Sequence, residues 1–236
     1  MGRRDLEVVR EGVDSFMERV LELYAWSGAP REEVEGMKHY HPASRMLEAY
    51  RRAAELDWRP LSGGSVLNAS GLELRVVEAP GHTPGHIVLV ADGLVFTGDT
   101  VLPGITPHVT LHSLDEDPLG SYLETLRRIE ELGPLTGLPG HRGVIRDTAA
   151  RAREIRAHHE QRLREVLDLL RRHGPLTGYE AARMMRWRTG YSSWSEYPVP
   201  ERFFALGEAL AHLRHLEERG LAERVERGGL LAWRAA

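Results

Sequence analysis

Cysteine is absent from this chain of 236 residues. Its absence excludes disulfide bonds, thiolate metal sites and cysteine nucleophiles together. The chain also has no apolar run as long as a membrane span, and its first residues are charged and lack the apolar core of a signal peptide. We therefore expect a cytoplasmic protein with no membrane partner.

Lysine is nearly missing, and neither sign of charge dominates. The sequence has 31 Lys+Arg, of which only Lys38 is a lysine, against 35 Asp+Glu, and the formal net charge is −4. The chain therefore carries no global basic field of the kind that attracts nucleic acid. A hydrophobic fraction of 42% is enough for a packed core, and the length suits one large or two modest domains.

The most informative stretch of the chain is EAPGHTPGHIVLVADGLVFTGDT, which runs from residue 78 to residue 100. Its apolar runs 87–90 and 94–96 are short, rich in strand-forming residues and bounded by turn residues, which predicts two buried strands. Asp92-Gly93 between them predicts a two-residue hairpin turn, because glycine accepts the positive φ that such a turn needs.

Polar side chains with metal-binding chemistry stand at the ends of these strands. His82 and His86 lie in the loop before the first strand, Asp99 follows the second, and His141 lies in a later loop of the same kind, LPGHRG. Rigid strands hold such residues while loops leave them accessible. Two imidazoles and a carboxylate on three glycine-flanked loops suit zinc, which accepts nitrogen and oxygen donors.

The ordered motifs PGHTPGH, GDT and PGHRG resemble the second half of the metallo-β-lactamase fold. In that family the corresponding two histidines and the aspartate are zinc ligands. The resemblance implies that His82 binds one zinc ion, that Asp99 bridges two, and that His141 binds the other. It also implies a hydrolase, although the sequence does not identify a further catalytic residue.

The family's main ligand cluster, His-x-His-x-Asp-His, is not found in this sequence. The nearest segment is HYHPAS at residues 39–44, which has Ala43 and Ser44 where the aspartate and the last histidine belong. We expect a solvated loop there rather than a ligand pair. The sequence thus resembles a metallo-β-lactamase domain without its N-terminal half, and the resemblance leaves open whether this chain alone is an enzyme.

For the other histidines, a structural role is an alternative to a functional one, and the sequence does not exclude it. His86 could orient a ligand or be a buried, hydrogen-bonded residue. His108 and His112 lie in an irregular, proline-containing segment, where we favour surface residues over substrate contacts. His158 and His159 are neighbours on a predicted helix and point in different directions, so packing is favoured over metal binding.

Helical and strand patterns fill most of the remaining N-terminal part. Apolar residues at helical spacing predict one amphipathic helix over residues 5–26 and another over 43–56. Alternating residues predict a hairpin within 61–79. Asp117-Pro118 has the residues that begin a helix, which Gly133-Pro134 ends.

The C-terminal part predicts a second domain. A long charged helix follows residue 149, Thr177 to Glu180 form a capping box, a helix covers 200–219, and Gly228-Gly229 joins a final hairpin. This order resembles a winged helix, found at the C-terminus of the subgroup that includes the endoribonuclease lactamase-beta-like protein 2. We expect an α/β (α+β) fold: the C-terminal half of an αββα sandwich over 1–150, and a helical linker and winged helix over 151–236.

Three functions remain open at this stage. The first is a zinc-dependent hydrolase of ester, thioester or phosphodiester bonds in a small-molecule substrate, whose metal site is incomplete in this chain. The second is a nuclease or nucleic-acid-binding protein, although the mixed charge of residues 200–219 gives no basic stripe. The third is a non-catalytic remnant that needs a partner to supply the missing sheet, and a homo-oligomer is also open.

Overall fold

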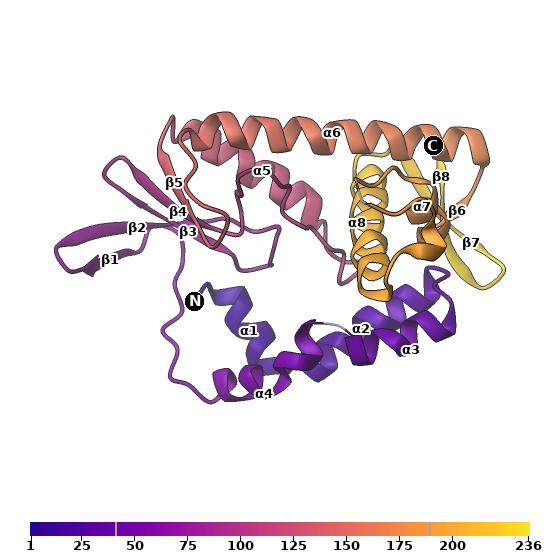
Figure 1. Ribbon diagram of the computed structural model, residues 1–236, viewed down its shortest axis with the longest axis horizontal. Helices are drawn as coiled ribbons and strands as arrows, with labels where there is room; N and C mark the ends of the chain where they lie inside the picture. Colours follow the sequence, from indigo (N-terminus) through magenta and orange to yellow (C-terminus); the bar gives the residue numbers. More distant parts are fainter. Residues whose placement is uncertain (41, 189) are drawn as a thin grey trace. The chain divides into compact units, whose positions relative to one another are not determined.

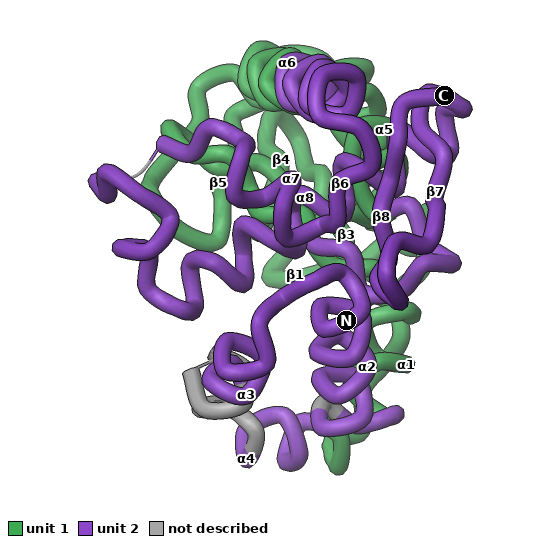
Figure 2. Tube along the Cα trace, turned by 90° about the vertical axis from the view of Figure 1, so that its right-hand side faces the viewer, with its two compact units in different colours: residues 1–10, 54–109, 118–160 green, residues 11–53, 110–117, 161–236 purple. Residues whose placement is uncertain are grey.

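The computed structural model describes residues 1–40, 42–188 and 190–236, with side chains except those of residues 13, 38–40 and 42–47. The chain folds into two compact units, each made of three separate segments (Figure 2). Unit 1 contains residues 1–10, 54–109 and 118–160, and unit 2 contains residues 11–53, 110–117 and 161–236. The domain boundary predicted at residue 150 stays a prediction.

Unit 1 is built on a sheet of five strands in the order β1-β2-β3-β4-β5 (Figure 1). The strands are β1 (Val66–Ala69), β2 (Leu72–Glu78), β3 (Ile87–Ala91), β4 (Leu94–Gly98) and β5 (Thr136–Pro139). The first four pair antiparallel, and β5 pairs parallel to β4. As a result β2, β4 and β5 all run in the same direction, and the loops that follow them leave the sheet at the same end.

The predicted strands of the central hairpin are confirmed. Gly93 has the positive φ of 69° that the turn between β3 and β4 requires. Val88 and Val95 are fully buried in one core cluster with Ala79, and Leu135 packs against it. Burial of this kind is the main favourable term in folding.

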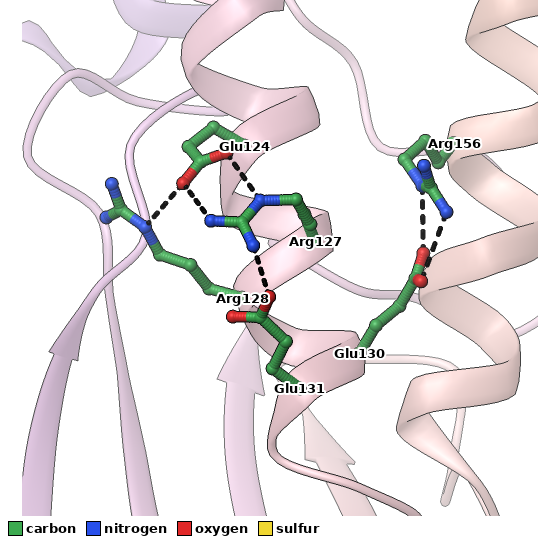
Figure 3. A network of polar contacts seen from close by, with 6 residues as sticks. All are labelled: Glu124, Arg127, Arg128, Glu130, Glu131 and Arg156. Carbon is green, nitrogen blue, oxygen red and sulfur yellow. Dashed lines mark hydrogen bonds and ion pairs between the residues drawn. The ribbon is translucent and has the colours of Figure 1, made fainter.

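Helix α5 (Pro118–Glu131) begins at Pro118, as the Asp117-Pro118 pair predicts. Its buried side chains are Leu119, Tyr122, Thr125, Leu126 and Ile129, which recur every three or four residues. Its other face carries the charged network of Figure 3. There Glu124 pairs with Arg127 and Arg128, while Glu130 receives two hydrogen bonds, of 2.9 and 3.1 Å, from Arg156 of α6 (Thr148–His173).

The single helix predicted over residues 5–26 is wrong, because the structure has two helices there. Helix α1 (Arg3–Glu11) ends before Gly12, and α2 (Val13–Trp26) follows it. Gly12 has a φ of 104°, which lies outside the helical region and is open mainly to glycine. The apolar spacing continues across the break, and for that reason the pattern alone did not reveal it.

The loop predicted around residues 39–44 is also wrong for the described backbone. Helix α3 (Arg31–Tyr40) occupies its start and α4 (Pro42–Ala54) its end. His41 and the side chain of His39, which were weighed as a ligand pair, lie outside the described residues and side chains.

Unit 2 combines α2, α3 and α4 with the C-terminal elements. A sheet in the order β6-β8-β7 joins β6 (Leu176–Thr177), β7 (Ala222–Arg227) and β8 (Leu230–Ala235). Helix α7 (Gly178–Met184) has the predicted capping box at Thr177 and Glu180. The 3-10 turn η1 (Trp194–Glu196) precedes the long helix α8 (Val199–Glu218).

Helix α8 is the central element of unit 2. Residues 209–213 are all buried, and five consecutive helical residues point around the whole circumference of a helix. Helix α8 is therefore covered on all sides over residues 209–213. None of the helices in the described parts of the chain combines the length and the apolar character of a membrane span.

Candidate metal centre

The structure brings His82, Asp99 and His141 together at one end of the sheet of unit 1. Each follows a strand that runs toward that end: β2, β4 and β5. His82 Nε2 lies 3.9 Å from Asp99 Oδ2, and His141 Nε2 lies 3.4 Å from Asp99 Oδ1. Each carboxylate oxygen of Asp99 thus faces a different imidazole.

Glycines permit this close approach of the loops. Gly98 adopts a φ of 51° just before Asp99, and its carbonyl accepts a 2.9 Å hydrogen bond from the Gly140 N–H. A Cβ atom on Gly140 would lie 2.8 Å from Asp99 Oδ1. A side chain at position 140 would therefore displace either the carboxylate or the loop of His141.

The imidazole of His82 has a fixed tautomer. Its Nδ1 lies 2.8 Å from the backbone carbonyl oxygen of His108, and because a carbonyl only accepts, Nδ1 carries the proton. The lone pair of Nε2 is then directed to the side of Asp99 and is available as a metal donor. The contribution of position 108 is its backbone carbonyl, which no side-chain pattern in the sequence could have indicated.

The segment that presents this carbonyl is held by Arg151 of α6. The guanidinium donates hydrogen bonds of 2.8 Å to the Leu102 carbonyl and 2.7 Å to the Ile105 carbonyl. Val101 and Val109, at the two ends of the segment, are fully buried. This irregular, proline-containing segment is thus a fixed part of the site.

His86 is half-buried and hydrogen-bonded, which corresponds to one of the two roles that the sequence left open. Its Nε2 accepts a hydrogen bond of 3.3 Å from the Asp99 N–H, so Nδ1 carries the proton and donates to Thr100 Oγ1 at 2.8 Å. Burial lowers the pKa of His86, and the neighbouring His82 lowers it further, in agreement with this neutral form. His86 is therefore a hydrogen-bonded residue that orients the turn carrying Asp99.

His159 and His112 take part in packing. His159 is fully buried and meets the Tyr122 ring edge-on at 5.6 Å between ring centroids. His112 packs against Phe16 with centroids 4.8 Å apart. These positions agree with the packing expected for His159, and His112 is part of unit 2 rather than of the sheet unit that holds the centre.

The donors fit zinc in type and in spacing. In a tetrahedral site with bonds of about 2.0–2.1 Å, two ligand atoms lie about 3.3 Å apart. The 3.4 Å between His141 Nε2 and Asp99 Oδ1 matches this value, and the 3.9 Å at His82 is somewhat wider. Asp99 Oδ1 is buried and has no hydrogen-bond partner among the described residues, although its carboxylate group is partly exposed.

The donors are too few in number. Within residues 1–40, 42–188 and 190–236, no three His, Cys, Asp or Glu side chains converge on a single metal position. Each pair at Asp99 would give one zinc ion two protein ligands, whereas catalytic zinc usually has three. The centre therefore has the chemistry of a metal site and an incomplete ligand set.

Known proteins are similar to this chain in sequence and in fold. A family model described as the metallo-beta-lactamase superfamily matches residues 18–141. Among solved structures, a metallo-beta-lactamase family protein of Thermus thermophilus is similar to this chain with a TM-score of 0.74 and 30% sequence identity. The likeness covers 97% of this chain and 67% of that one.

Curated relatives match over shorter stretches. A lactamase-like protein of Aspergillus fumigatus is 29% identical over 181 residues, which are 69% of this chain and 52% of the relative. A protein of Aspergillus aculeatus named atrochrysone carboxyl ACP thioesterase is 35% identical over 100 residues, or 42% of this chain and 30% of the relative. The chain spans about half the length of the first of these relatives.

Proposed function

Because the chain belongs to the metallo-beta-lactamase superfamily, we propose that it contributes His82, Asp99 and His141 as ligands to the zinc site of a hydrolase. The observation that carries this proposal is the position of Asp99, whose two carboxylate oxygens each face one of the two imidazoles. A carboxylate placed in this way can be shared between two metal ions.

The protein's own residues have defined tasks in such a site. His82 presents Nε2 as a donor because the His108 carbonyl holds the proton on Nδ1. His86 fixes the backbone of Asp99, so that the carboxylate keeps its place between the imidazoles. Zinc, when bound, lowers the pKa of water and polarises a carbonyl or phosphoryl oxygen. The further ligands that two zinc ions need lie outside the described residues of this chain.

The name of one relative supports a proposal for the substrate class. Hydrolysis of an ester, a thioester or a phosphodiester is within the reach of this chemistry. A relative that is named a thioesterase matches 100 residues of this chain, so thioesters are placed first. The side chains of His82, Asp99 and His141 are 28%, 39% and 49% exposed, which leaves room for a substrate to reach the site.

Residues 151–236 are proposed to be a winged-helix domain with a structural role. The β6-β8-β7 sheet, α7 and α8 have the element order of that fold. A helix that reads DNA needs an outward face with basic side chains. The exposed charges of α8 are acidic, at Glu201 and Glu218, and its middle is buried, so this arrangement disfavours a nucleic-acid function.

One observation favours the third function, a chain that needs a partner segment. Leu89, Phe96 and Leu138 pair directly across β3, β4 and β5 on one face of the sheet, and all three are partly exposed. An apolar row of this kind gains free energy when another surface covers it. A partner segment that covers this row would supply such a surface.

Zinc titration of the 236-residue chain tests the ligand assignment. We expect weak binding of added zinc, measured by competition with a chromophoric chelator, because each ion has two protein ligands. Asp99→Ala and His141→Ala should each weaken that binding about tenfold or more. His173→Ala, which removes an exposed histidine at the end of α6, is the matched control and should leave zinc affinity unchanged.

Two results would contradict the proposal. If Asp99→Ala and His141→Ala bind zinc as the unaltered chain does, the assigned residues are not ligands. If the unaltered chain binds no zinc at saturating concentrations, the centre is not a metal site. Hydrolysis of a simple acyl thioester should be slow at best, and any rate that zinc stimulates should fall with Asp99→Ala.

A further inference from the structure

A carboxylate far away in the sequence holds the loop of His82, which comprises residues 80–86. Asp5 lies in the first turn of α1, in unit 1. Its Oδ1 accepts a hydrogen bond of 2.6 Å from the Gly85 N–H, and its Oδ2 accepts one of 2.7 Å from the Thr83 hydroxyl. Both oxygens of Asp5 thus accept hydrogen bonds from the same loop, at the residues one and three positions after His82.

Two glycines let the backbone of α1 approach this loop closely. A Cβ atom on Gly85 would lie 2.2 Å from the backbone nitrogen of Asp5, and one on Gly2 would lie 1.8 Å from the Gly85 carbonyl oxygen. Real side chains do not tolerate such distances. Gly85 does not have a left-handed φ, so glycine is required there by lack of space rather than by its torsion angles.

Helix α5 holds the other end of the same loop. Thr125 Oγ1 donates a hydrogen bond of 2.8 Å to the Pro80 carbonyl. Gly81 has a φ of 140°, and a Cβ atom on it would lie 2.4 Å from Tyr122 Cβ. His82 therefore stands between a contact to α5 at residues 80–81 and a contact to Asp5 at residues 83 and 85.

We propose that Asp5 is a positioning residue of the candidate metal centre, which it serves by fixing the loop that carries His82. With the backbone of the loop held on both sides, the torsions of His82 itself are the remaining freedom, and the bond from Nδ1 to the His108 carbonyl fixes these. The contacts of α1 are then one of the three sets of contacts, with those of α5 and of the His108 carbonyl, that set the distance of 3.9 Å from Nε2 to Asp99. The role of the centre rests on the proposed function, whereas the effect of Asp5 on His82 does not.

The test compares His82 with His141 in the metal-free 236-residue chain. Imidazole signals are recorded by NMR with 15N-labelled histidine in the unaltered chain and in Asp5→Ala. We expect the Nδ1–H proton of His82 to exchange with water about tenfold faster in Asp5→Ala, since two hydrogen bonds of the loop are lost. The signals of His141, which lies on another loop, should keep their positions. Glu7→Ala, which removes an exposed acid from the same helix, is the matched control and should change neither histidine.

Two further variants separate geometry from charge. Asp5→Asn can still accept a hydrogen bond from the Gly85 N–H and donate one to the Thr83 hydroxyl. The Nδ1–H proton of His82 should therefore exchange at close to the unaltered rate in this variant. Gly85→Ala keeps the charge of Asp5 but forces α1 away from the loop, and it should reproduce Asp5→Ala. Gly63→Ala is its control, because a Cβ there meets only ordinary contacts at 3.4 Å or more.

Zinc affinity gives a second readout. Asp5→Ala and Gly85→Ala should weaken zinc binding about tenfold, in the range known for residues that orient ligands. Thr83→Val, which removes one of the two hydrogen bonds, replaces Asp5→Ala if that variant does not fold.

The proposal is overturned if His82 exchanges at the unaltered rate in a folded Asp5→Ala. It is also overturned if His82 and His141 change equally, since Asp5 would then be a general stability residue. Absence of zinc binding in the unaltered chain would contradict the proposed function and leave the result at His82 standing.

Discussion

His82, Asp99 and His141 each follow a strand end, but the atoms that direct their side chains belong to other segments. The His108 carbonyl holds His82, the imidazole of His86 accepts from the Asp99 N–H, and the Thr100 carbonyl accepts a 2.6 Å hydrogen bond from the Tyr122 hydroxyl. Each of these hydrogen bonds has a backbone group on one side, which every residue possesses. A substitution therefore removes such a bond where it changes the side chain on the other side, such as the Tyr122 hydroxyl.

Tyr122→Phe tests this dependence at a single atom. The change leaves the Thr100 carbonyl without its buried partner, which should cost about 1–3 kcal/mol in the free energy of unfolding. Urea denaturation measures this cost, and Tyr191→Phe, which removes an exposed hydroxyl 3.3 Å from Glu201 Oε1, should cost far less. Equal losses in the two variants would show that the Tyr122 hydrogen bond does not support the turn.

At the scale of elements, α5 shows how one helix serves two functions through its two faces. Tyr122 and Thr125 on its buried face bind the Thr100 and Pro80 carbonyls, and so hold the loops after β4 and β2. Its outer face carries the Glu124 network of Figure 3. Hydrogen bonds from Arg127 lower the pKa of Glu124 to about 2 from its ordinary value of 4.5.

The network predicts that the stability of the fold depends on pH, and it predicts the sign of that dependence. Because the folded pKa of Glu124 is depressed, its contribution to stability is present above about pH 4.5 and is lost as the pH falls toward 2. The Tm of the unaltered chain should exceed that of Glu124→Gln by a small amount at pH 7, since exposed ion pairs are screened by water and salt. The difference should vanish near pH 2.

Thermal unfolding at low ionic strength, at pH 7, 4 and 2.5, measures this dependence. Glu226→Gln removes an exposed carboxylate of β7 and controls for the change in net charge. A difference in Tm between the unaltered chain and Glu124→Gln that is the same at pH 7 and at pH 2.5 would contradict the assigned pairing.

At the scale of the molecule, each unit contains segments from distant parts of the chain. Unit 1 takes its first ten residues from the N-terminus and the rest from 54–109 and 118–160. In unit 2, α8 is surrounded by apolar contacts, and the Trp187 ring is covered by the Arg162 guanidinium at 4.4 Å from the ring centroid. Arg162 and Trp187 are thereby engaged with each other within the unit.

Nucleic-acid binding should accordingly be weak. The protein has a net charge of −4, and the middle of α8 is buried. Labelled single-stranded RNA and duplex DNA should therefore show no saturable binding to it below about 100 µM at 50 mM salt. Fluorescence anisotropy measures this directly. Micromolar affinity that falls steeply between 50 and 200 mM salt would favour the nucleic-acid function instead.

Local patterns in the sequence predicted much of the candidate centre. The strands around Asp92-Gly93, the capping box at Thr177 and the loops that carry His82, Asp99 and His141 were all readable, because each is encoded within a few neighbouring residues. The break at Gly12 and helix α3 were missed, since the periodic apolar pattern continues through the first and the composition around the second is polar.

The sequence by itself therefore determined which residues stand at the strand ends and what chemistry they offer. The tertiary structure decided how they are held. Asp5 accepts hydrogen bonds from the loop of His82, and the His108 carbonyl accepts one from its imidazole. Arg151 holds the segment that presents this carbonyl. Turns and strands depend on the torsional preferences and burial of adjacent residues. Contacts such as that of Asp5 with Thr83, 78 residues apart, depend on how whole helices and loops pack, and no local pattern records that packing.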